Sequence, residues 1–443
     1  MAREIDIARL IDEAPLSGFQ VRIVAFCALA SFLDGYDVQA LGLTVPRMAE
    51  TFGVAPTAFA PALSGSLVGM TLGAMLLAPL GDRFGRRPMM IALMAVIGLS
   101  TLGVMLAPNL VVLTAWRVAT GLAIGAAVPI AVAMTSEYTP TRLRAGLITV
   151  VIAAMAFGSF ASGIVAPIFD GLWGWRGIFA VGAAMPLVLA AGLWAGFPES
   201  LRFLIARGRK PEEVLRQLRR IAPGEDDIVP VAAAPTQVVK ASLRALFNPL
   251  YRFRTTLLWV ILWFNLFAAY SLISWLPTLL HSAGWATADA QRATGLVALG
   301  GIAGGLCISW IADRGHIIKT LVGAYVATAI LLGLIMTGPG NVAVWTGLLT
   351  LVGAGAFGAQ MALISISAAH YYPPELRSTG VGWYSGIGRF GAIVGPLALA
   401  ELMKVGWASG SILGFLIIPM LVCACGVLLI PRALSSEGRS SLA

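Results

Sequence analysis

The chain has 443 residues, of which 58% are apolar and only 12% charged. Its mean hydropathy of +0.87 lies far from a soluble protein, in which roughly a quarter of residues are charged. This composition excludes a soluble enzyme or binding domain. The net charge of +9 is spread over short loops without an aromatic-basic recognition stretch, so it favours the lysine and arginine excess of membrane loops over nucleic-acid binding.

The N-terminal tail, residues 1–18, is too charged for a signal peptide, and no signal peptide is expected to be removed. The spacing of Ile5, Ile7, Leu10 and Ile11 suits a short helix on the membrane surface. A frayed tail is the alternative. The sequence leaves both open.

Apolar runs long enough to cross a bilayer as helix recur along the whole chain. They predict an all-α integral membrane protein with twelve transmembrane helices in two pseudo-symmetric six-helix halves around a central cavity. The predicted spans are 19–46, 59–80, 88–107, 110–133, 145–168, 175–197, 255–280, 290–312, 318–337, 341–369, 379–402 and 408–431.

The only long polar segment divides these spans into two halves. The predicted organisation is a tail (1–18), a first half (19–197), a cytoplasmic loop (198–254), a second half (255–431) and a C-terminal tail (432–443). With the N-terminus cytoplasmic, nearly all loop lysines and arginines fall on the cytoplasmic side. Both termini are therefore expected in the cytoplasm.

Corresponding loops of the two halves resemble each other. GDRFGRRP follows the second span and ADRGHIIK the eighth, while PTRLR follows the fourth and PPELR the tenth. This repetition indicates a duplicated six-helix unit, an organisation typical of secondary transporters with a site at mid-depth between the halves.

The twelve-span spacing, the loop GDRFGRR and the stretch RVATGLAIGAAVP resemble the major facilitator superfamily over essentially the full chain. Within it, PLSGFQ ahead of DGYD, SWLPTLL and GIGRFGAIVGP are similar to the aromatic acid:proton symporter family. The resemblance implies alternating access driven by a proton gradient.

Asp34 and Asp37 are the acidic residues inside the spans, and their i, i+3 spacing places them on one helix face. Asp34 lies about 18 Å beyond the cytoplasmic Arg22 at 1.5 Å per residue. A carboxyl at that depth favours its neutral form and can take and release a proton as its surroundings wet and dry. We expect proton coupling at Asp34 and Asp37, with a structural acid as the alternative.

Arg117 and Arg389 are the cations inside the spans, one in each half. Arginine keeps its charge when buried and matches a carboxylate with a planar fork. Arg389, about 15 Å into its span, is expected to bind the substrate carboxylate. Arg117 is expected to pair with Asp34 or assist proton transfer, with a structural ion pair as the alternative.

Aromatic residues in the cavity-lining spans of the superfamily could form stacking walls for a benzoate-like ring, although lipid-facing packing is an alternative for each. The predicted substrate-binding residues beside Arg389 are Tyr36, Phe157, Phe160, Tyr270, Trp275, Trp383 and Tyr384.

The resemblance also implies a gate at the cytoplasmic loops, where charges and helix ends latch one side of the transporter. The predicted gating residues are Asp82, Arg83, Gly85, Arg86, Arg87, Glu137, Arg144, Asp313, His316 and Arg377. Their alternative role is to set topology.

We predict a proton-coupled symporter that imports a small aromatic carboxylate, such as benzoate or a hydroxybenzoate, across the inner membrane. The alternative is a porter for a non-aromatic organic acid or sugar. An enzyme is not expected, because no nucleophile and base pair, metal cluster or phosphate-binding loop is apparent. The expected partners are the substrate, the proton and the bilayer, with no cofactor, metal or nucleic acid, and the protein is expected to be monomeric.

Overall fold

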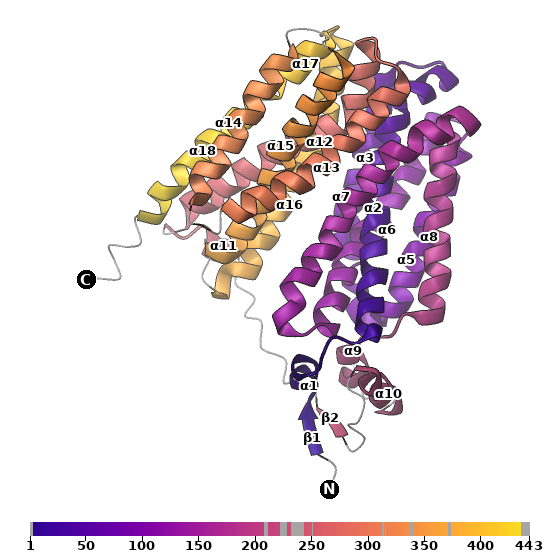
Figure 1. Cartoon of the computed structure of the whole chain (residues 1–443), viewed down its shortest axis with the longest axis vertical. Helices are drawn as coiled ribbons and strands as arrows, with labels where there is room; N and C mark the ends of the chain where they lie inside the picture. The colour runs from indigo at the N-terminus through magenta and orange to yellow at the C-terminus, as the bar shows by residue number, and fades with distance from the viewer. Residues whose placement is uncertain are drawn as a thin grey trace. The chain divides into compact units, whose positions relative to one another are not determined.

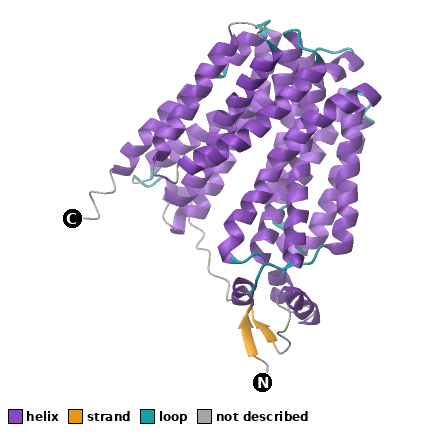
Figure 2. Ribbon diagram, in the orientation of Figure 1, coloured by secondary structure: helices purple, strands orange, loops and turns teal. Residues whose placement is uncertain are grey.

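The computed structural model describes residues 3–207, 211–221, 228–231, 243–249, 251–311, 314, 316–336, 341–370 and 374–435 (Figure 1). Nearly all of these residues are helical, and the only strands among them are two short ones (Figure 2). The sequence-based expectation of an all-α membrane protein is confirmed, with a small sheet added.

The helices of the first part of the chain run from the N-terminal tail to the loop after the sixth span. They are α1 (Ile7–Glu13), α2 (Gly18–Phe52), the 3-10 helix η1 (Pro56–Phe59), α3 (Ala60–Leu76), α4 (Leu80–Phe84), α5 (Arg86–Met105), α6 (Leu110–Tyr138), α7 (Thr141–Trp173), α8 (Arg176–Gly196), α9 (Leu201–Ala206) and α10 (Pro211–Ile221).

The helices of the second part begin after strand β2. They are α11 (Leu243–Leu246), α12 (Arg252–Ser282), α13 (Thr287–Ile311), α14 (Ile317–Met336), α15 (Val342–His370), α16 (Pro374–Lys404), α17 (Ser409–Phe415) and α18 (Ile417–Ser435).

Eleven segments within the described residues are long and apolar enough to cross a membrane. Helix α2, of 35 residues, stands outside that set and carries Asp34 and Asp37. With α2 the described residues supply a helix for each of the twelve predicted spans. The protein is therefore a multi-pass membrane protein.

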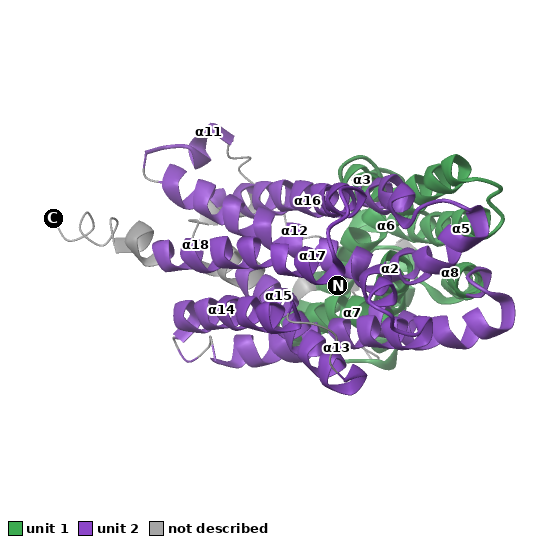
Figure 3. Cartoon of the chain, turned by 90° about the horizontal axis from the view of Figure 1, so that it is seen from above, with its two compact units in different colours: residues 1–38, 68–158, 178–237 green, residues 39–67, 159–177, 238–443 purple. Residues whose placement is uncertain are grey.

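Packing contacts group the chain into two compact units (Figure 3). Unit 1 comprises Met1–Val38, Val68–Gly158 and Ile178–Gln237, and unit 2 comprises Gln39–Leu67, Ser159–Gly177 and Val238–Ala443. The division predicted from loop spacing, with halves at 19–197 and 255–431, stays a prediction.

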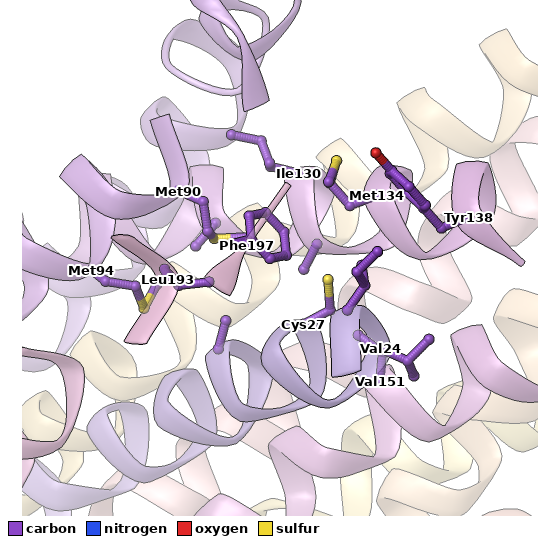
Figure 4. Packing of buried hydrophobic residues seen from close by; sticks show 14 of the residues in the cluster. Val24, Cys27, Met90, Met94, Ile130, Met134, Tyr138, Val151, Leu193 and Phe197 are labelled. Atoms are coloured by element: carbon purple, nitrogen blue, oxygen red, sulfur yellow. The ribbon is translucent and has the colours of Figure 1, made fainter. Parts of the chain in front are cut away.

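A continuous apolar core fills unit 1 (Figure 4). It joins Val24 and Cys27 of α2 to Met134 of α6 and Leu193 of α8, all of them buried. The same core continues out of the spans into the buried side chains of α9 and α10. The loop helices after the sixth span thus pack on the end of the helix bundle.

Unit 2 contains close helix crossings at small residues. A side chain on Gly163 of α7 would lie 2.6 Å from the Cα atom of Gly295 in α13, so these helices meet backbone to backbone. The Gln291 side-chain amide donates to the Leu43 carbonyl at 3.1 Å, and the Ser64 hydroxyl donates to the Ile393 carbonyl at 2.9 Å. Within unit 2, segments 39–67 and 159–177 are therefore fixed to α13 and α16.

The N-terminal tail contains the short helix considered from the sequence, but a strand precedes it and the helix packs against the protein. Strand β1 (Arg3–Asp6) pairs in parallel with β2 (Ile228–Val231), Arg3 opposite Ile228. In α1, Ile7, Leu10 and Ile11 are buried in the core that also contains the apolar face of α10. The tail is thus packed against the segment that follows the sixth span.

Asp12 fixes this tail to the start of α7. Its carboxylate accepts the Thr141 backbone N–H at 2.6 Å and the Thr141 hydroxyl at 2.8 Å. The Arg142 guanidinium donates to the carbonyls of Asp12 and Ala14 at 2.6 and 2.8 Å. The hydrogen bond from the Thr141 backbone lowers the pKa of Asp12, so the contact persists at neutral pH and is lost as pH falls through that lowered pKa.

Replacing Asp12 by alanine should release α1, because the capping bonds to Thr141 contribute about 1 kcal/mol. We expect roughly fivefold faster hydrogen exchange across residues 7–14 of the detergent-solubilised protein at pH 7. Glu13→Ala is the matched control, since Glu13 pairs only with the exposed Arg9 of its own helix. Equal acceleration in both variants would contradict the anchoring role of Asp12.

Candidate functional site: buried charges and the adjoining gate

A buried ion pair joins α2 to α6. Nη1 of Arg117 lies 2.8 Å from both carboxylate oxygens of Asp37, and Nη2 donates to the Asp37 carbonyl at 3.3 Å. The side chains are 1% and 4% exposed, respectively. Asp37 is therefore an ion-pair partner of Arg117. The pairing of Arg117 with Asp34 that the sequence analysis expected stays a prediction.

Asp34 is also buried, at 3% exposure, one helical turn from Asp37. Its neighbour Gly35 faces α7, where any side chain would run into the Met155 backbone, and Gly158 of α7 faces the Phe32 carbonyl in the same way. The two helices therefore touch through their backbones at the depth of Asp34.

Asp34, Asp37 and Arg117 together place three ionisable side chains in the buried part of unit 1. Arg117 keeps its charge when buried, whereas each carboxyl can become neutral by binding a proton. With both carboxyls ionised the set carries one net negative charge, and with one of them protonated it is neutral. A net charge at this depth costs several kcal/mol, so the two states of the set differ in the cost of enclosing it.

The predicted aromatic and cationic substrate residues lie in different surroundings. The Tyr36 hydroxyl donates to the Ile178 carbonyl at 3.0 Å, and the Trp275 indole donates to the Pro396 carbonyl at 2.8 Å, so both side chains link helices. The remainder are grouped by burial: Tyr384 is buried, Phe160, Tyr270 and Arg389 are partly buried, and Phe157 and Trp383 are 48% and 43% exposed. Their substrate role stays a prediction.

The loop after the second span is held by a carboxylate that the sequence analysis missed. Oε1 of Glu199 accepts the backbone N–H groups of Arg86, Arg87 and Ser200 at 2.8, 3.2 and 2.8 Å. Burial raises the pKa of Glu199, while these hydrogen bonds oppose the rise. The sequence signal was the PES motif directly after the sixth span, which placed an acid at a helix boundary.

The predicted gating residue Arg86 connects two further acids. It forms ion pairs with Asp82, at 3.1 Å, and with the buried Glu137 of α6. The Ser200 hydroxyl donates to the other oxygen of Glu137 at 2.5 Å and caps α9 through the Phe203 N–H. Loop, α6 and α9 are therefore joined in one network, which we call the Glu199 network (Asp82, Arg86, Arg87, Glu137, Glu199 and Ser200).

The other predicted gating residues are more scattered. The Arg83 carbonyl accepts from Arg207 at 2.5 Å, Arg87 donates to the Trp194 carbonyl at 2.7 Å, and Arg144 donates to the Thr139 carbonyl at 3.2 Å. His316 is exposed. Asp313 lies outside the described residues, and the side chain of Arg377 is not among those described.

A cavity of about 580 Å³ adjoins the Glu199 network. Its lining includes Phe84, Ile91 and Trp194 with Arg87 and Glu199. It contains none of Asp34, Asp37 and Arg117, so its position associates it with the loop network and not with the buried charges of the spans.

Sequence and structure comparisons place the chain among known transporters. It is 36% identical to a 4-hydroxybenzoate transporter of Acinetobacter baylyi over 96% of this chain and 93% of that protein. It is 34% identical to a gallate transporter of Pseudomonas putida over 96% and 94% of the two chains. The partially occluded inward-open xylose transporter of Escherichia coli matches its fold with a TM-score of 0.70 at 18% identity, covering 94% and 99%.

Multiple membrane-crossing helices and these relatives define the class: a multi-pass membrane transporter, and not an enzyme. The chain belongs to the Major Facilitator Superfamily, whose family model matches residues 27–396.

Breaking the buried ion pair from its two sides should have unequal effects. Asp37→Leu leaves a guanidinium that cannot lose its charge, so it should cost about 3–5 kcal/mol of stability. Arg117→Met leaves a carboxyl that can take up a proton, so its cost should be smaller and should shrink at lower pH. Thermal unfolding of the purified variants between pH 5 and 8 measures both.

The double variant Asp37→Leu with Arg117→Met supplies the control for this pair. Removing both charges leaves no unpaired ion, so its melting temperature should lie nearer the wild type than that of Asp37→Leu. Additive losses in the double variant would argue against a direct energetic coupling.

Gly85 is a separate test of the Glu199 network. Its φ of +108° disfavours any side chain, and a Cβ atom there would collide with the Glu199 carboxylate. Gly85→Ala should therefore lower stability by about 1–3 kcal/mol and loosen the loop. Gly146→Ala is the control, because a Cβ atom at Gly146 would meet no other atom, and its melting temperature should be unchanged.

Proposed function

We propose that this protein is a proton-coupled symporter that imports a small aromatic carboxylate, such as benzoate or a hydroxybenzoate, by alternating access. The observation that carries the coupling is the buried set of two carboxyls and one guanidinium at Asp34, Asp37 and Arg117. The names of the relatives, which are transporters of 4-hydroxybenzoate and gallate, support the substrate class.

In this mechanism, Asp34 carries the proton and the Arg117–Asp37 pair supplies a fixed neutral neighbour. With Asp34 ionised, the set retains a net charge, and enclosing it during the conformational change costs several kcal/mol. Protonation removes that charge and makes closure favourable. The proton is thus required electrostatically for the conformational step.

Arg389 of α16 is the proposed partner of the substrate carboxylate. Its guanidinium matches a carboxylate in shape and charge, and it is partly buried. Trp383 of the proposed substrate set lies on the same helix, and its ring stacks on Trp259 with centroids 6.2 Å apart.

The proposed location is the inner membrane, with both termini in the cytoplasm and the protein acting as a monomer. The support is the concentration of lysine and arginine in the loops assigned to the cytoplasmic side. Under this orientation, α1, α9 and α10 lie at the cytoplasmic ends of the spans of unit 1.

The test is uptake of radiolabelled 4-hydroxybenzoate into proteoliposomes with and without an inward proton gradient. The wild type should accumulate substrate only with the gradient, and unlabelled benzoate should compete where xylose and succinate do not. Competition by the sugar or the aliphatic acid alone would instead identify a porter for a non-aromatic substrate.

Asp34→Asn should abolish gradient-driven accumulation in this assay, because asparagine cannot exchange a proton at that depth. Exchange of labelled for unlabelled substrate across the membrane should survive, since it requires no net proton movement. Asp289→Asn is the control: Asp289 is 42% exposed and pairs with Arg292 on α13, so uptake should stay normal. Gradient-driven accumulation by Asp34→Asn would refute the assignment.

A further inference from the structure

Two arginines from distant parts of the chain flank one aromatic ring in unit 1. Phe19 is the second residue of α2, and the guanidinium carbon of Arg22 lies 5.5 Å from its ring centroid. The guanidinium carbon of Arg220, in the last turn of α10, lies 5.6 Å from the same centroid. The two charges can therefore be no farther apart than twice that distance.

Neither arginine has a carboxylate partner among the described residues, and both side chains are exposed. This distinguishes them from Arg47, Arg86 and Arg117, each of which forms an ion pair. The Phe19 ring holds each cation by a cation–π contact, but the like charges repel each other. An anion bound to both guanidinium groups would relieve that repulsion.

The position of Arg22 on α2 indicates where such an anion would come from. Ala25 and Leu29 lie three and seven residues further along and share its helix face, and both are exposed, as is the adjoining Val21. An exposed apolar stripe on a membrane-spanning helix offers a surface along which lipid tails can pack. Arg22 stands one turn beyond this stripe, at the depth of the lipid headgroups.

Helix α10 brings further positive charge to the same place. Its apolar side, with Val214, Leu218 and Ile221, is buried in the core of unit 1. Arg216, Arg219 and Arg220 are exposed on the other side. Clusters of arginine directly beside a membrane span attract anionic lipids by about 1 kcal/mol for each charge near the surface.

We propose that Phe19, Arg22 and Arg220 form a binding site for the phosphate headgroup of an anionic phospholipid, with its acyl chains along the exposed stripe of α2. The shared headgroup holds α10 against the start of α2. The site is separate from the proposed substrate and proton residues, and it does not depend on the transported substrate.

The headgroup site is one ring away from the Glu199 network. Phe19 packs edge-on against Tyr138, with centroids 6.1 Å apart. The Tyr138 hydroxyl is 2.5 Å from the Glu199 carbonyl and 2.6 Å from Oε1 of Gln217 in α10. A lipid that fixes Phe19 and α10 therefore also fixes the surroundings of Glu199, which accepts the backbone N–H groups of Arg86 and Arg87.

The experiment measures phosphatidylglycerol binding to the full-length protein by native mass spectrometry, with phosphatidylcholine as the neutral comparison. Arg22→Gln with Arg220→Gln should weaken phosphatidylglycerol binding at least tenfold and leave the weak phosphatidylcholine binding unchanged. Arg202→Gln with Arg252→Gln is the matched control, since it removes the same charge from exposed positions outside α10, and it should change binding less than twofold.

Two further variants keep the test independent of folding. Arg22→Lys with Arg220→Lys retains the charges and should keep most of the binding, whereas Phe19→Leu retains both arginines without the ring and should lose part of it. Equal losses in the two double glutamine variants would indicate general charge attraction and overturn the site. Displacement of the lipid by inorganic phosphate at constant ionic strength would assign a soluble anion instead and also overturn it.

Discussion

The buried Arg117–Asp37 pair constrains how α2 packs against α6. A guanidinium cannot be neutralised by losing its proton, so once Arg117 is placed inside α6, a carboxylate must stay beside it. That requirement fixes the rotation of α2 against α6, because Asp37 must face Arg117 at 2.8 Å. Gly35, the neighbour of Asp34, faces α7, where Gly35 and Gly158 let the backbones meet.

A second polar network stabilises the end of unit 1 outside the spans, and it works differently. Asp37 and Arg117 in the spans form a direct ion pair. Glu199 instead accepts three backbone N–H groups, and Glu137 and Asp82 form the ion pairs with Arg86. Hydrogen bonds to backbone N–H groups fix the position of a turn without depending on the charges of its side chains. The loop after the second span is therefore shaped by Glu199 and charged by its arginines, and the two properties can be altered separately.

The fold and the identity of the buried charges could be predicted from the sequence, because apolar runs define the spans and any ionisable residue inside one stands out. The pairing could not. Asp34 and Asp37 share a helix face, so the sequence pattern does not decide which carboxyl lies level with Arg117; that depends on where α2 stands along α6. The orientation of Tyr36 and Trp275, whose polar atoms bond backbone carbonyls of other helices, depends on helix rotations that the pattern does not decide either. Glu199 was missed because an acid just after a span reads as an ordinary loop charge. The docking of α1 was missed because its partners in α7 and α10 lie more than one hundred residues away along the chain.

The pairing of β1 with β2 has a consequence for the order of events during synthesis. Arg3 bonds in register with Ile228, so the first strand has no partner until the ribosome has completed the first six spans. At about 5–20 residues per second, that takes roughly ten to fifty seconds. During this interval the N-terminal tail emerges unpaired while α2, with its two acids, has already entered the bilayer. The pairing of β1 with β2 then joins the segments before and after the first six spans. It can form only after all the helices between them have been made.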